Sequence, residues 1–249
     1  MILNYKTRKH YYINLYILMG VNESVQLNEK YFGFRIYNLI PNGPLSKSGV
    51  NIIDDFIIPP EDMYIKKLPF SDWIKEKADQ TIPLTIYSLS KRAKKEIQVK
   101  VNPLGSKEGL LGGSVRYENY TTAPKNVLHV LKVKKNSFAK DKLDLQEKED
   151  YLIALRPIQG DIITLNRANS NPLELFGAMI KQNIGKECDF FIFNRKRGGR
   201  AVTAQIDNNQ FFEMGCDVAF GKLHEYPYEQ RNSEESQKLK EESGEIENI

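Results

Sequence analysis

Apolar and polar residues follow the same order twice along the chain. In the first half, residues 34–40 alternate like a strand, 42–44 form a turn, 45–50 have the spacing of a short helix and 54–58 form a buried strand. The matching segments of the second half are residues 127–133, 136–138, 139–145 and 150–153. A repeat of roughly 100 residues is too long for a solenoid and indicates two similar domains.

Each half continues with a helix and a hairpin. Apolar residues at helical spacing predict helices over residues 70–78 and 173–180, with Ser71 and Asn171 as N-caps. The hairpins pair residues 84–88 with 96–101, and residues 189–194 with 201–206. Each unit then ends with a glycine-containing turn and a strand, at residues 109–117 and 213–220.

Both hairpin tips are basic. Residues 91–95 read Lys-Arg-Ala-Lys-Lys, and residues 195–200 read Arg-Lys-Arg-Gly-Gly-Arg. Such tips can add binding to an anionic membrane surface, or they can be solvated turns that protect a sheet edge. The Arg197-Gly198-Gly199 stretch looks like an RNA-binding box, but one copy between two strands is more simply a tight turn.

These elements predict an α+β protein with four parts. Residues 1–29 form an N-terminal leader, and residues 30–119 and 120–228 form the two domains. Residues 229–249 are rich in Glu, Ser and Lys and have few apolar residues. Because such a segment cannot bury enough apolar surface to offset its ordering entropy, we expect an acidic, disordered tail.

Composition and charge exclude several classes of protein. The 249 residues are 41% hydrophobic and 27% charged, as in ordinary globular proteins. A net charge of +4 is too balanced for a dedicated nucleic-acid binder. The apolar run over residues 11–19 is too short to span a bilayer, and the weak basic-then-apolar start lacks a clear signal-peptide cleavage site.

The cysteines and histidines point to no metal and no catalysis. Two cysteines, Cys188 and Cys216, are too few for a disulfide framework and have no zinc-finger spacing, so we expect a reduced, intracellular chain. A Cys–His pair of Cys216 with His129 or His224 is a possible nucleophile and base, although a buried cysteine is usually a small apolar residue. We therefore expect no enzyme and no cofactor.

An internal methionine starts a lipidation motif. Residues 19–24 read Met-Gly-Val-Asn-Glu-Ser and match the M-G-x-x-x-[ST] pattern of N-myristoylation. That pattern acts only at a true N-terminus. Translation therefore starts at Met19 and Gly20 carries the lipid, or the match is chance and the segment is a flexible leader.

The turn Gly109-Leu110-Leu111-Gly112 resembles the carboxylate-binding loop of PDZ domains. In an ordinary PDZ domain this loop comes early, whereas here a strand, a short helix, a strand and the groove helix precede it. Two such units in tandem resemble the Golgi reassembly and stacking protein (GRASP) family. The resemblance implies two tandem PDZ-like domains, each a small, partly open β-barrel with two helices and a circularly permuted strand order.

Four segments and the internal start carry this resemblance. The segments are residues 42–58 with Asn-Gly-Pro and Asp-Phe-Ile, 109–117 with Gly-Leu-Leu-Gly, 127–131 with Val-Leu-His-Val-Leu, and 215–227 with Leu-His-Glu-Tyr-Pro. Met19-Gly20 falls where family members begin.

The second loop, residues 213–216, lacks the first glycine, which puts peptide binding by domain two in doubt. Arg35 and Glu118 stand where some members contribute His and Cys to a partner's zinc site, so no metal is implied here.

The resemblance implies a non-enzymatic, peripheral protein on the cytoplasmic face of Golgi membranes. It would tether them by self-association and bind golgin-like coiled-coil proteins or C-terminal tails of cargo. The implied peptide-binding residues are Gly109, Leu110, Leu111, Gly112, Ser114, Val115, Arg116 and Tyr117, with Trp73 and Ile74 from the groove helix. The alternative is a soluble PDZ adaptor for cargo trafficking or unconventional secretion, which needs the groove and no lipid.

A segment after domain two is a second candidate site. By resemblance, Leu223, His224, Glu225, Tyr226 and Pro227 form an internal ligand for domain one of another molecule. The same pattern fits a terminal segment packed on its own domain. The sequence leaves both readings open.

Overall fold

A computed structural model describes residues 31–167, 170–208 and 213–228. The predicted leader, the possible start at Met19, the lipidation candidate Gly20 and the predicted acidic tail lie outside the described residues. Among the described residues, no helix is long and apolar enough to cross a membrane.

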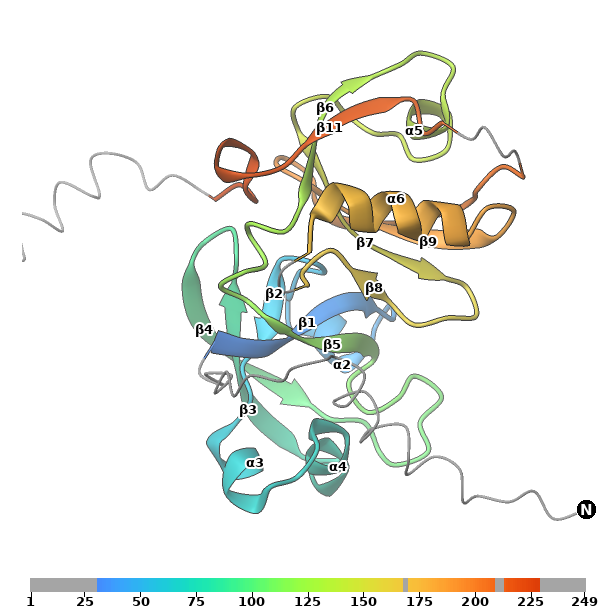
Figure 1. The fold of residues 1–249 in the computed structure, drawn as a ribbon. Helices are drawn as coiled ribbons and strands as arrows, with labels where there is room; N and C mark the ends of the chain where they lie inside the picture. The colour runs from blue at the N-terminus through green and yellow to red at the C-terminus, as the bar shows by residue number, and fades with distance from the viewer. Residues whose placement is uncertain (1–30, 168–169, 209–212, 229–249) are drawn as a thin grey trace, which may run out of the picture. The chain divides into compact units, whose positions relative to one another are not determined.

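The first sheet contains five antiparallel strands in the order β4-β3-β2-β1-β5 (Figure 1). They are β1 (Phe32–Leu39), β2 (Asp55–Ile57), β3 (Thr81–Ser88), β4 (Ala93–Lys100) and β5 (Gly113–Asn119). The strands predicted in this half are therefore present. As far as the described residues show, β4 and β5 are the two edge strands, and β5 pairs only with β1.

Among the described residues, three helices accompany the first sheet, and two were predicted. They are α2 (Pro44–Lys47), α3 (Glu61–Lys66) and α4 (Phe70–Glu76). The unexpected helix α3 starts after Pro60, and Glu61 and Asp62 in its first turn suit the positive end of the helix dipole. The predicted cap at Ser71 is wrong, because α4 starts at Phe70 and Pro69 is its N-cap.

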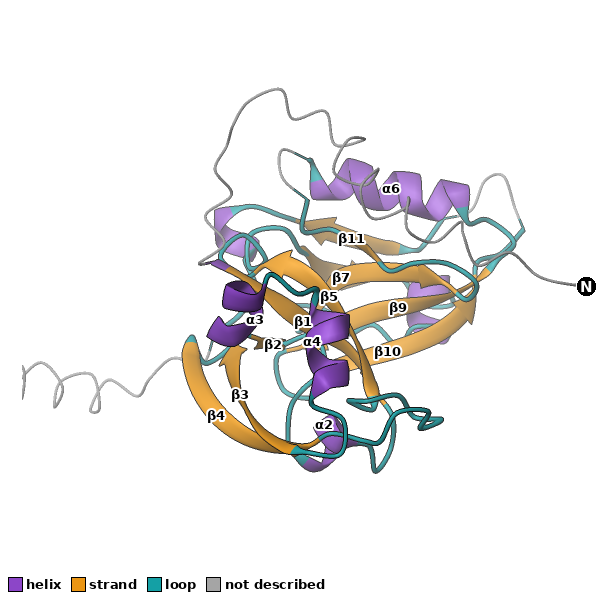
Figure 2. Ribbon diagram, turned by 90° about the horizontal axis from the view of Figure 1, so that it is seen from below, coloured by secondary structure: helices purple, strands orange, loops and turns teal. Residues whose placement is uncertain are grey.

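The second sheet repeats the strand order of the first, as β10-β9-β7-β6-β11, with β8 paired to β7. Its elements are β6 (Leu128–Val133), α5 (Phe138–Asp141), β7 (Asp150–Pro157), β8 (Ile163–Thr164), α6 (Pro172–Gln182), β9 (Glu187–Asn194), β10 (Gly198–Gln205), β11 (Cys216–Ala219) and the 3-10 helix η2 (Lys222–His224). The predicted cap Asn171 is confirmed, since its side chain accepts hydrogen bonds from the backbone of Leu173 and Glu174. Figures 1 and 2 both show α6 lying along this sheet.

Each sheet buries its own apolar core, and a third cluster joins the two sheets. Both sheets belong to the compact unit that begins at Tyr31. The shared cluster takes Tyr37, Ile53, Phe56 and Leu89 from the first half and Tyr151, Ile153, Phe191, Phe193 and Tyr226 from the second. The ring centroids of Tyr37 and Phe191 are 4.9 Å apart in an edge-to-face arrangement, a geometry that stabilises aromatic pairs.

A buried carboxylate adds a polar connection between the halves. Glu118 on β5 accepts a hydrogen bond of 2.6 Å from the Tyr37 hydroxyl and lies 3.6 Å from the Arg35 guanidinium. From the second half, the Thr164 hydroxyl and the Asn166 amide each lie 3.4 Å from the other carboxylate oxygen. The two positions that the resemblance relates to a zinc site therefore hold a buried ion pair.

Each half has an equivalent buried aspartate, and the two aspartates differ in their bonding partners. Asp55 lies opposite Ser88 in the first sheet, and Asp150 lies opposite Asn194 in the second. Each accepts a hydrogen bond of 2.9 Å from the backbone nitrogen four residues earlier. Asp150 is also paired at 2.7 Å with Arg200, whereas the buried Oδ1 of Asp55 has no hydrogen-bond partner among the described residues.

Burial, with a smaller effect of the neighbouring Asp54 carboxylate, raises the pKa of Asp55 from 3.8 to about 6. The folded protein therefore binds one more proton than the unfolded chain between about pH 4 and pH 6, and this contribution to stability is lost as the pH rises through 6. Relative to Asp55→Asn, we expect the wild-type free energy of unfolding to fall by on the order of 2–3 kcal/mol between pH 4 and pH 7. Urea titrations across this range measure the difference.

Asp150→Asn is the matched control. It breaks a buried ion pair and is expected to destabilise the chain by about 3 kcal/mol at neutral pH. Lys95 on β4 has the same position as Arg200 on β10. The Lys95 amine donates to the Gly49 carbonyl, and the Arg200 guanidinium donates to the equivalent carbonyl of Asp144. Lys95→Arg is therefore expected to reduce the pH dependence. Equal pH slopes for wild type and Asp55→Asn would contradict this account.

Candidate functional site

The glycine loop between β4 and β5 is held from one side by its own carbonyl groups. The Leu111 carbonyl accepts from the Leu45 amide at 3.0 Å, and the Gly112 carbonyl accepts from the Ile40 amide at 2.8 Å. Gly112 has φ +65°, and a Cβ there would lie 2.7 Å from the Gly43 Cα. Only glycine fits this close approach.

The amides of this loop remain available. Within the described residues, the backbone N–H groups of Leu110, Leu111 and Gly112 donate to no acceptor, whereas the Gly109 amide bonds to the Ser106 carbonyl. Successive backbone N–H groups without internal partners form a site suited to an anion such as a carboxylate.

The strand that follows the loop, β5, is an edge strand of the described sheet and has two different faces. Val115 packs on the first core, and the Tyr117 ring stacks near Phe32 and Phe34, at centroid distances of 5.2 and 4.9 Å. Arg116 points the other way and bonds to the Ile162 carbonyl of the second half. Ser114 has a buried hydroxyl without a partner among the described residues. Among the described residues β5 pairs only with β1, so its other edge is a candidate for pairing with a further strand.

The groove helix contributes to the core more than the prediction supposed. Trp73 and Ile74 on α4 are only 3% and 5% exposed, so both side chains are largely buried in the first core, and their part in peptide binding stays a prediction. An aromatic row connects helix and strand instead, with Phe34 and Phe70 stacked at 4.1 Å and Phe34 in contact with Tyr117. The half-buried Phe34 was missed, although its place in an alternating strand could have indicated it.

The C-terminal segment packs on its own chain. Tyr226 is 2% exposed, its hydroxyl donates to Asp54 at 2.9 Å, and its ring centroid lies 4.3 Å from that of Phe193. Leu223, in contrast, is 91% exposed. Among the other candidate-ligand residues, His224, Glu225 and Pro227 are half-buried, and the His224 Nδ1 lies 3.1 Å from that of His129. This placement favours the second reading of the segment, because Tyr226 is not free to bind another molecule.

Asp54 fixes both the first hairpin turn and this segment. Its carboxylate accepts from the Ser88 hydroxyl at 2.6 Å and from the backbone nitrogen of Ser90 at 2.9 Å, in addition to Tyr226. Burial and the nearby carboxylate raise the pKa of Tyr226 well above its usual value, so the hydroxyl remains a donor.

The two basic tips are not equivalent. At the second tip, Lys196, Arg197 and Arg200 form ion pairs with Glu149, Asp144 and Asp150. A Cβ on Gly199 would collide with the Ile52 carbonyl of the first half, which gives this glycine a packing role. Three of the four basic side chains of the second tip are therefore paired with acidic residues, and binding of either tip to a membrane stays a prediction.

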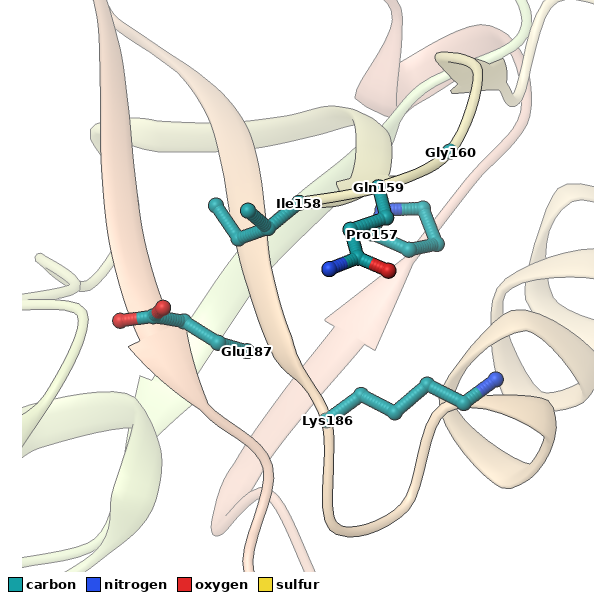
Figure 3. Close-up of a pocket in the computed structure, with 6 residues that line it drawn as sticks. All are labelled: Pro157, Ile158, Gln159, Gly160, Lys186 and Glu187. Atoms are coloured by element: carbon teal, nitrogen blue, oxygen red, sulfur yellow. The ribbon is translucent and has the colours of Figure 1, made fainter. Parts of the chain in front are cut away.

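The described residues offer no support for catalysis or a resident metal. Burial raises the pKa of Cys188 and of Cys216 to about 11 each, so neither thiol ionises readily. No cluster of three or more His, Cys, Asp or Glu side chains suited to a metal occurs among the described residues. A shallow pocket of about 530 Å³ lies away from the glycine loop, at residues 157–160 with Lys186 and Glu187, whose side chains diverge (Figure 3).

A glycine loop with available amides, followed by an open edge strand beside a helix, is the arrangement of a PDZ-like domain. The family model described as the GRASP55/65 PDZ-like domain matches residues 84–229, more than half of the chain. The chain belongs to this family.

Curated relatives agree with this assignment. Golgi reassembly-stacking protein 1 of Homo sapiens is 24% identical over 200 residues, which cover 78% of this chain and 43% of the relative. Golgi reassembly-stacking protein 1 of Mus musculus is 24% identical over 214 residues, which cover 84% and 45%. The chain spans less than half the length of these relatives.

Removing the buried hydroxyl of Tyr226 leaves Asp54 with one donor fewer. We expect Tyr226→Phe to lower the free energy of unfolding by about 1–3 kcal/mol, because a buried acceptor loses its partner. Thermal unfolding followed by near-UV circular dichroism measures the change. Leu223→Ala is the control in the same segment and should leave stability unchanged; equal stability of Tyr226→Phe and wild type would contradict the buried contact.

Proposed function

We propose that this protein is a non-enzymatic scaffold that binds peptide C-termini through its first PDZ-like site and organises Golgi membranes. The observation that carries the proposal is the glycine loop, whose three available amides precede the open edge of β5. Family membership and the two relatives named Golgi reassembly-stacking protein support the Golgi setting.

We infer that the chain contains two PDZ-like domains in tandem, residues 30–119 and 120–228. The identical strand orders support this division. The loops correspond as well. The carbonyls of Leu111 and Gly112 accept backbone hydrogen bonds in the first half, and the carbonyls of Met214 and Gly215 do so in the second. In both units the loop and its strand come last in the chain, which is the circularly permuted order.

The first domain provides the better peptide site. A ligand carboxylate would bind the amides of Leu110, Leu111 and Gly112, and the ligand backbone would extend the sheet along residues 114–117. Phe34 and Tyr117 would contact its side chains beside α4. In the second domain, Gly215 keeps φ +75° against Ser137, but the sequence has Phe212 where the first loop has Gly109. We therefore assign peptide binding to domain one.

Tethering requires attachment to membranes and self-association. Myristoylated Gly20 would attach the protein to the cytoplasmic face of the Golgi, and pairing of many copies would turn weak contacts into firm adhesion. Partners would be further copies of this chain, golgin-like coiled-coil proteins or cargo tails, and nucleic acid is not among them. Because Tyr226 is held in its own chain, an internal ligand at residues 223–227 requires that segment to detach.

The alternative function is a soluble adaptor for cargo trafficking or unconventional secretion. It uses the same loop and strand, which do not depend on Gly20. The two functions therefore differ in membrane attachment rather than in the peptide site.

A negative charge introduced beside the loop tests the peptide site. Leu110→Asp places a carboxylate next to the three amides, so we expect binding of short peptides with a free, apolar C-terminus to weaken by about tenfold or more. Fluorescence anisotropy with a labelled peptide library measures it, with amidated peptides as a second comparison. Leu104→Asp, at an exposed position before the same loop, is the control. Unchanged binding by Leu110→Asp, or equal binding of amidated peptides, would refute the assignment.

The mass of the native N-terminal peptide tests membrane attachment. For protein recovered from cell membranes, we expect a peptide that begins at Gly20 with a myristoyl group, because the motif acts at a true N-terminus. Tandem mass spectrometry resolves the two starts. An intact Met1 would rule out this lipid and leave the soluble adaptor.

A further inference from the structure

The first hairpin tip carries positive charge that the described residues do not neutralise. Lys91, Arg92 and Lys94 are exposed and form no ion pair with any described residue. The contrast with the second tip is informative, because its basic side chains at 196, 197 and 200 are each paired with an acidic residue. An exposed cluster of like charges within one hairpin is electrostatically unfavourable unless a counter-charge approaches it.

The C-terminal segment leads directly to this tip. Tyr226 is anchored on Asp54, whose carboxylate also accepts from the Ser90 backbone in the hairpin turn. Two residues later, the Tyr228 ring centroid lies 4.0 Å from the Arg92 guanidinium carbon, a close cation–π contact. The chain after Tyr228 therefore starts beside the basic tip.

The residues that follow carry the complementary charge. Residues 229–249 contain seven glutamates and three basic residues, which gives a net charge of −4. A segment tethered at its binding site has an effective concentration in the millimolar range, so contacts that are weak one by one can still be occupied.

We propose that residues 229–249 bind the first hairpin tip of the same chain, with their glutamates paired to Lys91, Arg92 and Lys94. This intramolecular contact neutralises the tip and keeps it from other anionic surfaces, including membrane headgroups. The inference does not rest on the peptide site or on lipidation. Because the pairs are exposed, the contact weakens as salt rises and the Debye length falls from about 10 Å at 0.1 M to about 3 Å at 1 M.

Zero-length cross-linking of the full chain tests the contact. Carbodiimide joins a lysine amine to a neighbouring carboxylate, and peptide mass spectrometry identifies the pair. At low salt we expect cross-links from Lys91 or Lys94 to glutamates of residues 229–249, with the same yield after about tenfold dilution because the reaction is intramolecular. At 1 M salt the yield should fall by about fivefold or more.

A charge-reversal pair provides the matched comparison. Lys91→Glu with Lys94→Glu removes the reactive amines, so the Arg92-containing tip should no longer protect tail glutamates from labelling by a small amine. Lys132→Glu with Lys135→Glu changes two other exposed lysines by the same charge and should leave both the cross-links and the protection intact. Absent cross-links, yields that fall on dilution, or tail cross-links distributed equally to Lys132 and Lys135 would each overturn the proposal.

Discussion

The buried carboxylate of Glu118 is the contact on which the arrangement of the two halves depends. A charge taken out of water is costly unless it is paired, and losing one partner of such a pair costs on the order of 3–5 kcal/mol. Arg35 and Tyr37 satisfy Glu118 from within the first half, while Thr164 and Asn166 approach it from the second. The second half therefore supplies polar groups around a buried carboxylate that belongs to the first sheet.

The contacts of Glu118 with the second half make the two faces of β5 different. Arg116 and Glu118 on one face join the second half, whereas Val115 and Tyr117 on the other face pack toward the first core and its aromatic row. The hydrogen-bonding edge between these faces is the one to which we propose that a ligand strand pairs. The contacts between the halves therefore hold the strand to which the proposed peptide would pair.

The two halves keep one backbone plan and distribute their charges differently. Loop carbonyls, strand order and the backbone bonds to Asp55 and Asp150 correspond. The second half has ion pairs at its basic tip and at its buried aspartate, while the first half has no ion pair at either place among the described residues. Where backbone geometry is shared, function can diverge through side chains, and the unmatched charges of the first half are the places to expect it.

The sequence by itself determined the α+β class, the repeated strand order, the glycine loop and the cap at Asn171, because periodicity and turn chemistry act over short stretches of chain. It also indicated the family, through segments that retain its motifs. Local pattern did not reveal that Trp73 and Ile74 face the core, that Tyr226 is buried against Asp54 or that Arg35 pairs with Glu118. Those outcomes were decided by the tertiary structure, because burial and ion pairing depend on which distant segments meet, and residues 54 and 226 come together only when the two halves pack.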